Sequence, residues 1–175
     1  MPIASAPSLY LRLKNGKEGG LEFAPLMDLL LLADSKALDY PFTAFDDDET
    51  GRSVGVDSFA GRGKKGGLVG YRYRFLPSPL SAQQKRSAEV ELERACEQFP
   101  DLEKWVLVTP EDFTKRDSEW LERLEYRFRS APGRKKPASV RRVIAVEHWG
   151  HTEIARLMVR YPHIVENFFP EIAVA

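Results

Sequence analysis

The chain has 175 residues, of which 43% are apolar, and its 26 basic and 26 acidic side chains leave no net charge. This length is enough to bury a core and predicts one domain. The balanced charge alone gives no argument for a nucleic-acid or membrane partner. The single cysteine, Cys96, excludes an internal disulfide and a cysteine-based zinc site. The longest apolar stretch, 29–33, is too short to span a membrane and no signal-peptide pattern is present, so we expect a cytoplasmic protein without a membrane partner.

Residues 1–20 are predicted to form a strand or hairpin extension. Leu9, Leu11 and Leu13 alternate with other side chains, as in a half-buried strand, and the pair 15–16 favours a turn. From residue 21 to residue 175 we expect one compact domain. The tail 171–175 shows no clear structural stop, which favours a piece of a larger protein.

Helices and strands are predicted to alternate along this domain. The segment 21–33 places its apolar residues on one helical face, with Pro25 in the first turn. The other expected elements are a strand around 54–59 after an acidic loop, a basic turn at 62–67, a strand at 68–76, a helix at 81–98 capped by Ser81, a strand at 105–109, a helix at 117–128, a basic exposed loop at 130–139, a strand at 143–146, a helix at 153–161 and a closing helix from 164. This order predicts an α/β sandwich with a mixed central sheet, in which the later strands are parallel neighbours.

Asp57 is the first residue with a candidate chemical role. Aspartate is a poor strand former, yet Asp57 closes the apolar run 53–56. It could bind a turn through hydrogen bonds, or it could be a ligand of Mg²⁺, which prefers carboxylate oxygens. Phosphodiester hydrolysis uses such an ion to neutralise charge and to generate hydroxide.

Two arginines share one face of the next predicted strand. Side chains alternate along a strand, so Arg72 and Arg74 project to one side, while Tyr71, Tyr73 and Phe75 project to the other and are expected in the core. The arginines could form a solvated face or a cationic surface that binds phosphate. The turn residues Arg62, Lys64 and Lys65 would extend that surface, as would the second basic cluster at 134–136 and 141–142.

Several segments together resemble a known superfamily. They are Glu22-Phe23, Gly55-Val56-Asp57, the run 71–74, the run 105–110, and the closing segments 147–154 and 161–164. In their order and spacing they resemble the restriction-endonuclease-like PD-(D/E)XK superfamily, and in particular the nuclease-like domains fused to bacterial STAND-type NTPases. The resemblance implies a restriction-endonuclease-like sandwich, a role in antiviral defence, and DNA, or alternatively RNA, as a partner. It also implies an NTPase domain or partner protein, through which the chain could oligomerise.

The resemblance also implies site residues, and this chain departs from the family pattern at two of them. Asp57 would hold the metal, with Glu22 as the helix acid, and Mg²⁺ would be the cofactor of an active enzyme. Arg72 stands where an acid or amide would complete the metal site, and guanidinium has only donors. Arg74 stands where the family has its lysine. Some members carry the missing acid on the following helix, where this chain has glutamates at 89, 91 and 93; a solvated helix face is the alternative for them.

Other motifs support weaker interpretations. Residues 46–57 imitate a calcium loop but lack its final glutamate. His148 and His151 could form a metal pair, or could belong to a turn at the start of a helix capped near Thr152 and Glu153. Cys96 is expected in the core.

Three hypotheses follow from the sequence. The first is a nuclease-like module that binds nucleic acid and has an impaired cleavage site. The second is an active Mg²⁺-dependent DNase that uses Asp57, with Glu22 or another helix acid as second ligand and Arg74 replacing the lysine. The third is a protein-interaction module without a nucleic-acid role.

Overall fold

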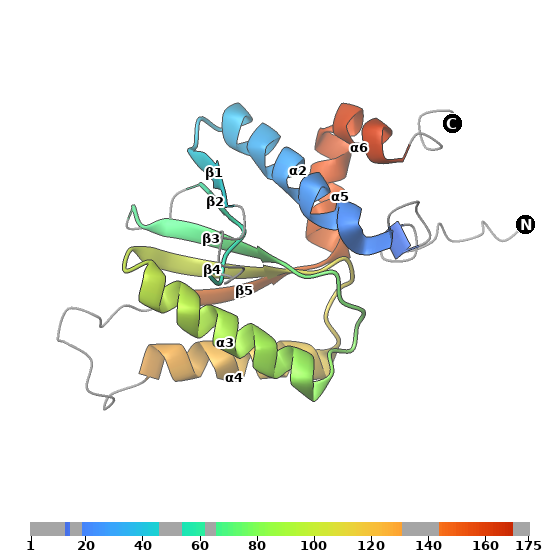
Figure 1. Cartoon of the computed structure of the whole chain (residues 1–175). Helices are drawn as coiled ribbons and strands as arrows, with labels where there is room; N and C mark the ends of the chain where they lie inside the picture. The colour runs from blue at the N-terminus through green and yellow to red at the C-terminus, as the bar shows by residue number, and fades with distance from the viewer. Residues whose placement is uncertain (1–12, 15–18, 46–53, 62–65, 131–143, 170–175) are drawn as a thin grey trace, which may run out of the picture.

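A computed structural model describes residues 13–14, 19–45, 54–61, 66–130 and 144–169 of the chain. In Figure 1 a central sheet lies between two layers of helices. One layer contains α2 (Phe23–Ala37), α5 (His151–Arg160) and α6 (Pro162–Phe168), and the other contains α3 (Ala82–Gln98) and α4 (Lys115–Ser130). A short 3₁₀ helix, η1 (Gly19–Glu22), precedes α2. The predicted α/β sandwich is therefore confirmed at the level of its layers.

The described sheet has five strands in the order β1-β2-β3-β4-β5. They are β1 (Phe42–Ala44), β2 (Ser58–Ala60), β3 (Leu68–Tyr73), β4 (Leu102–Val108) and β5 (Ala145–Trp149). The first three strands pair antiparallel, whereas β3, β4 and β5 pair in parallel. The helical crossovers α3 and α4 separate the parallel strands in the chain. The mixed sheet and the parallel later strands are as predicted, while β1 was not anticipated.

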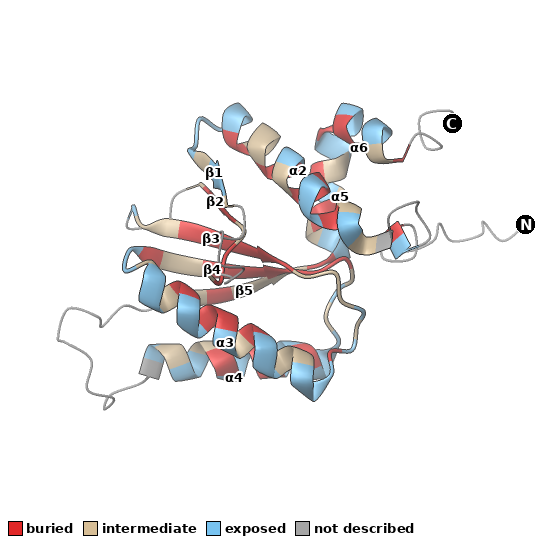
Figure 2. Ribbon diagram, viewed as in Figure 1, coloured by how far each residue is buried: buried red, intermediate tan, exposed pale blue. Residues whose placement is uncertain are grey.

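Each face of the sheet has its own hydrophobic core. On the α2 side, Tyr71 and Tyr73 of β3 pack with Val106 and Val108 of β4 against α2, α5 and α6. On the α3 side, Trp105 and its neighbours pack against α3 and α4. Figure 2 shows buried residues on the helix faces that are turned toward the sheet, with exposed residues on the outer faces. The predicted alternation along 71–75 is confirmed, because the aromatic side chains belong to the α2-side core.

Local chemistry explains where α3 begins and how closely it approaches the sheet. The Ser81 hydroxyl accepts a hydrogen bond from the Gln84 backbone N–H, and the Gln84 side chain accepts one from the Ser81 N–H. This capping box satisfies two donors that a helix start leaves unpaired. Gly55 contacts the same helix with a φ of +86°, and a Cβ there would lie 2.1 Å from the Glu91 carbonyl oxygen. Only glycine fits this approach.

Some predicted segments fall outside the described residues. These include residues 1–12 of the expected extension, most of the acidic loop, the turn residues 62–65 and the basic loop. Leu13, the last residue of the expected N-terminal strand, is helical with Lys14 and fully buried in the α2-side core. Within the described part of the chain, no helix is long and apolar enough to cross a membrane.

Candidate functional site: an ion cluster between the sheet and α3

Asp57 lies immediately before β2 and is fixed to β3 by its backbone and its side chain. Its N–H donates to the Tyr71 carbonyl at 2.7 Å, and its own carbonyl accepts from the Phe45 N–H at 2.8 Å. The carboxylate atom Oδ2 accepts from the Tyr73 N–H at 2.6 Å. The two interpretations of Asp57 were a carboxylate that binds backbone groups and a ligand of Mg²⁺. In the structure, one carboxylate oxygen binds the backbone of the neighbouring strand.

The guanidinium of Arg72 lies between two carboxylates. Its Nη1 donates to Asp57 Oδ1 at 2.5 Å. Its Nε and Nη2 donate to Oε2 and Oε1 of Glu91 at 3.2 and 3.3 Å. The second pair is a two-pronged contact, which matches the planar fork of guanidinium to the two oxygens of one carboxylate. Arg72 and Glu91 are 5% and 4% exposed, so these charges interact almost without solvent.

Arg74 completes the cluster at its outer edge. Its Nε donates to Glu91 Oε2 at 3.1 Å, and its Nη2 forms an ion pair with Glu91 Oε1. The side chain of Arg74 is 34% exposed, so the cluster reaches the surface there. We call Asp57, Arg72, Arg74 and Glu91 the ion cluster. Two cations and two carboxylates leave the ion cluster with no net charge. This pairing offsets part of the cost of removing the charged groups from water.

The structure buries two charged residues of the ion cluster. Arg72 was expected on a solvated or phosphate-binding strand face, but helix α3 covers it. For Glu91 the sequence left two alternatives, a solvated helix face or an acid that the helix supplies to the site, and the structure buries it against the sheet beside Arg72. Glu93, on the same helix, is exposed. The physical reason is that Arg72 and Glu91 neutralise each other, because a charged side chain is rarely buried unless it is paired with an opposite charge.

The ion cluster does not fit a magnesium ion. The carboxylates that could bind one, Asp57 and Glu91, are both bound to the same guanidinium. Arg72 offers donors and a positive charge where a metal needs acceptors. In the described residues, no three His, Cys, Asp or Glu side chains form a group that could hold a metal ion.

Of the other predicted site residues, Glu22 lies in the described part of the chain, and it is not part of the ion cluster. Glu22 ends η1, in the helical layer on the opposite face of the sheet from α3. The predicted nucleic-acid-binding residues Arg62, Lys64 and Lys65 lie outside the described part of the chain, and so does the second basic cluster. Their roles therefore stay predictions.

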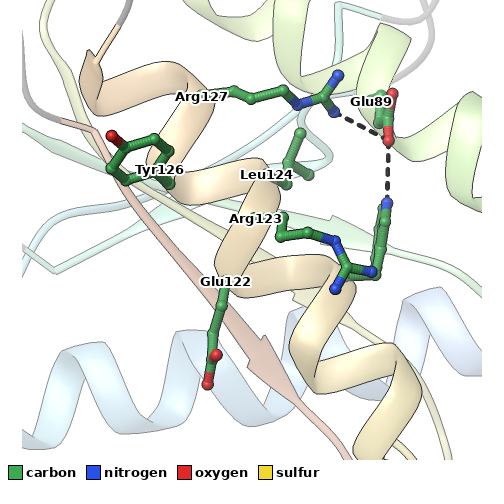
Figure 3. Close-up of a pocket in the computed structure, with 7 residues that line it drawn as sticks. Glu89, Glu122, Arg123, Leu124, Tyr126 and Arg127 are labelled. Atoms are coloured by element: carbon green, nitrogen blue, oxygen red, sulfur yellow. Dashed lines mark hydrogen bonds and ion pairs between the residues drawn. The ribbon is translucent and has the colours of Figure 1, made fainter.

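Glu89 points to helix α4 and away from the ion cluster. Its Oε1 accepts from the Trp120 indole at 2.9 Å and pairs with Arg127 Nη2 at 2.9 Å. Figure 3 shows these contacts beside a surface hollow of about 530 Å³ on α3 and α4. The hydrogen bonds from Trp120 and Arg127 outweigh partial burial and lower the pKa of Glu89. This glutamate ties two helices together.

The two histidines occupy different environments. His148 stacks on Phe113 with ring centroids 3.5 Å apart, and its Nε2 lies 2.7 Å from Thr109 Oγ1. Because the Thr109 hydroxyl donates to the Glu111 carbonyl at 2.9 Å, His148 Nε2 must be the donor to Thr109. Burial lowers the pKa of His148 to about 4, although Asp112 and Asp117 oppose the shift.

His151 is the first residue of α5, so the predicted helix start at this segment is confirmed. The Glu153 carboxylate accepts from the Gly150 N–H at 3.1 Å, and Asp112 accepts from the N–H and the hydroxyl of Thr152. Cys96, expected in the core, is half-buried against the α3-side core.

Two buried polar groups were missed by the sequence analysis. Tyr73 shares its hydroxyl with Ser58 at 2.5 Å and donates to Asp28 at 2.9 Å. Asp117 is fully buried and pairs with Lys85 Nζ at 2.7 Å. Burial alone would raise the pKa of Asp117, but the contacts with Lys85 and Thr114 lower it below its ordinary value. Tyr73 and its partners are distant in the chain, which leaves no local signal, whereas Asp117 also has a local partner in Thr114, three residues before it.

No protein-family model, curated protein or solved structure matches this chain. The functional argument therefore rests on the ion cluster and on the sequence.

Proposed function

We propose that this chain is a nuclease-like module that does not cleave, and that it serves as a nucleic-acid-binding or effector part of a bacterial NTPase or defence assembly. The observation that carries the first half of the proposal is the position of Arg72, whose guanidinium joins Asp57 to Glu91. A permanent cation belonging to the protein stands where a divalent ion would have to sit.

Energetics support this half of the proposal. For Mg²⁺ to reach Asp57 and Glu91, Arg72 would have to leave a buried site and both carboxylates would lose its hydrogen bonds. Breaking a buried ion pair in this way costs on the order of 3–5 kcal/mol. Arg74 would remain beside Glu91 and repel the incoming ion. The arrangement thus favours a closed, neutral cluster over a metal centre.

The second half of the proposal rests on the sequence resemblance and on charge. Arg74 reaches the surface at the edge of the ion cluster. The segment with Arg62, Lys64 and Lys65 joins β2 to β3 along the chain, and β3 carries Arg72. A protein that neutralises phosphates with such residues binds nucleic acid with a strong dependence on salt.

A plasmid-nicking assay with Mg²⁺ or Mn²⁺ tests the loss of cleavage. We expect the wild type, Asp57→Ala and the matched control Glu93→Gln, which alters an exposed carboxylate of α3, to leave the plasmid intact. Cleavage by the wild type and by Glu93→Gln that disappears in Asp57→Ala would refute the proposal and establish an active DNase.

Fluorescence anisotropy with labelled duplex and single strands tests the binding role. We expect binding at low salt that weakens as salt rises, and a weaker complex for the double variant Lys64→Ala, Lys65→Ala. The control Arg156→Ala removes an exposed charge from α5 and should bind like the wild type. Absence of binding to every strand at low salt would contradict this role and leave a protein-interaction module.

A further inference from the structure

A groove of about 580 Å³ lies mainly on the face of the sheet opposite the ion cluster, and its lining extends to Glu125 and Arg129 of α4. Its wall is the C-terminal half of α2 and its floor is formed by β3, β4 and β5. In Figure 1 the C-terminal end of α2 lies farther from β4 and β5 than its N-terminal end does. The groove has the volume of a small-molecule site, which is roughly 300–1,000 Å³.

The floor and wall are apolar at their centre. Leu31, Val69, Val106 and Trp149 line the groove, and all of them belong to the α2-side core or pack against it. Trp149 meets the ring of Tyr71 edge-on, with centroids 5.0 Å apart. These side chains offer an apolar surface to a ring or an aliphatic chain.

Tyr71 carries an unpaired hydroxyl into this groove. The residue is 7% exposed and lines the groove, and its hydroxyl has no hydrogen-bond partner among the described residues. Tyr73, two residues along the same strand, shares its hydroxyl with Ser58 and Asp28. The hydroxyl oxygen is open to the groove, because it is not one of the fully enclosed side-chain atoms that lack a partner in the described residues. A ligand in the groove can therefore form a hydrogen bond with it.

Two carboxylates beside Tyr71 each keep an oxygen without a partner among the described residues. Asp34 accepts from Arg160 and Tyr161, at 2.5 and 2.9 Å, through Oδ1 alone. Glu147 pairs with Lys104 at 2.6 Å through Oε1 alone. After burial, the charges of Glu147 and Asp34 are the next largest causes that raise the pKa of Tyr71, so both carboxylates act on its hydroxyl. The charged lining residues number four acids and two bases, which favours a cation.

We infer that this groove binds a primary amine with an aromatic or aliphatic body. An ammonium has three N–H donors. They match the three unpaired oxygen acceptors, which are the Tyr71 hydroxyl, Asp34 Oδ2 and Glu147 Oε2. The apolar body of the amine packs on Val69 and Val106. This inference concerns the opposite face of the sheet and does not depend on the proposed function.

Phenethylamine and 2-phenylethanol form a matched pair of probes, because they share a ring and a chain and differ in charge. Methyl signals of Val69 and Val106 are followed by NMR during titration, with Leu92 in the α3-side core as the internal control. We expect phenethylamine to shift the two valine signals, to leave Leu92 unchanged, and to bind about tenfold more tightly than the alcohol. Equal affinities, or no valine shift by the amine in the millimolar range, would overturn the inference.

Tyr71→Phe and Tyr40→Phe provide the matched variants. Tyr40 also lines the groove, at its exposed rim, but its hydroxyl has no part in the inferred contact. We expect Tyr71→Phe to weaken phenethylamine binding severalfold with an unchanged circular dichroism spectrum, and Tyr40→Phe to bind as the wild type does. Glu147→Gln should weaken binding as well. Amine affinities that are unchanged in both Tyr71→Phe and Glu147→Gln would refute the assignment of the ammonium site.

Discussion

Arg72 carries a permanent positive charge into the space between β3 and α3, where solvent has almost no access. Two carboxylates hold it there through three hydrogen bonds, and one of them, Glu91, is as deeply buried as the arginine itself. Burying an ion pair offers little net stability over an apolar core, but removing one member leaves the others uncompensated. The residue therefore matters to the fold as much as to the proposed loss of cleavage.

Arg72→Gln is expected to lower the free energy of unfolding by about 3 kcal/mol, because Asp57 would lose its cation and the buried Glu91 would keep only the partly exposed Arg74. Urea denaturation measures the change. The control Arg123→Gln removes an exposed arginine from α4 and should change the free energy of unfolding by less than about 0.5 kcal/mol. Equal, small effects of the two substitutions would show that the ion cluster is not formed as described.

The two tyrosines of β3 are expected to respond differently to loss of their hydroxyls. Tyr73→Phe removes the hydroxyl that bonds to both Ser58 and Asp28 and should cost about 1–3 kcal/mol. Tyr71→Phe removes a hydroxyl that has no partner among the described residues, so it should leave the free energy of unfolding unchanged or slightly higher. Thermal unfolding of both variants gives the comparison. A Tyr71→Phe variant that is destabilised as much as Tyr73→Phe would contradict the unpaired state of that hydroxyl.

At the level of elements, the approach of α3 to the strands is what closes the ion cluster. Gly55 allows the approach, and its carbonyl accepts from the Trp105 indole at 2.9 Å. Gly66 has a similar φ of +80° but faces open space. Alanine substitutions at the two glycines can therefore be compared. Both introduce backbone strain, but only the substitution at Gly55 also pushes α3 away from the strands.

Gly66→Ala is expected to cost about 1–2 kcal/mol, the usual penalty for a left-handed backbone conformation in a residue with a Cβ. Gly55→Ala should cost clearly more, because its Cβ would also overlap the backbone of α3. Urea denaturation of both variants provides the test. If the two alanine variants are equally stable, α3 does not pack on Gly55 as closely as described.

Most elements could be predicted because their signals are local. Apolar periodicity and the Ser81 cap located α3, and the run 105–109 located β4. β1 could not be predicted, since its three residues are defined only by pairing with β2. The sequence named three glutamates of α3 as possible site acids, but it could not show which of them is buried, because the partners of Glu91 lie on β3. Asp57, Arg72 and Arg74 could be singled out from the sequence, but their binding to one another could not.

At the scale of the whole molecule, the sheet separates two faces with different chemistry. The α3 face holds the ion cluster, in which every charge has a partner. The α2 face holds the groove, where three oxygens lack partners among the described residues. The order of predicted elements was enough to derive this sandwich, because alternating strands and helices have few ways to pack. The chemistry of each face depends on side-chain contacts between elements, which the order of elements does not specify.

The stability of the whole fold is expected to fall as the pH drops below neutral, because His148 is buried in its neutral form. Its pKa is about 4 in the folded protein against an ordinary 6.5, so the unfolded chain takes up a proton first. Between about pH 7.5 and about pH 5.5 this should cost about 1 kcal/mol of unfolding free energy. Urea denaturation at both pH values measures it. His148→Gln keeps a hydrogen-bond donor for Thr109 and should lose most of this pH dependence of stability. If the variant kept the same pH dependence, groups other than His148 would be its cause.

The central claim is that Arg72 excludes a divalent ion from Asp57, and Mn²⁺ tests it without relying on activity. A bound Mn²⁺ broadens the NMR signals of nearby groups, and the backbone N–H of Tyr73 lies 2.6 Å from Asp57 Oδ2. We expect Mn²⁺ to broaden the Tyr73 amide signal no more than that of Ile164, which lies in α6 in the helical layer on the other side of the sheet (Figure 1). Selective broadening of Tyr73 that disappears in Asp57→Asn would show a metal at this carboxylate and contradict the account.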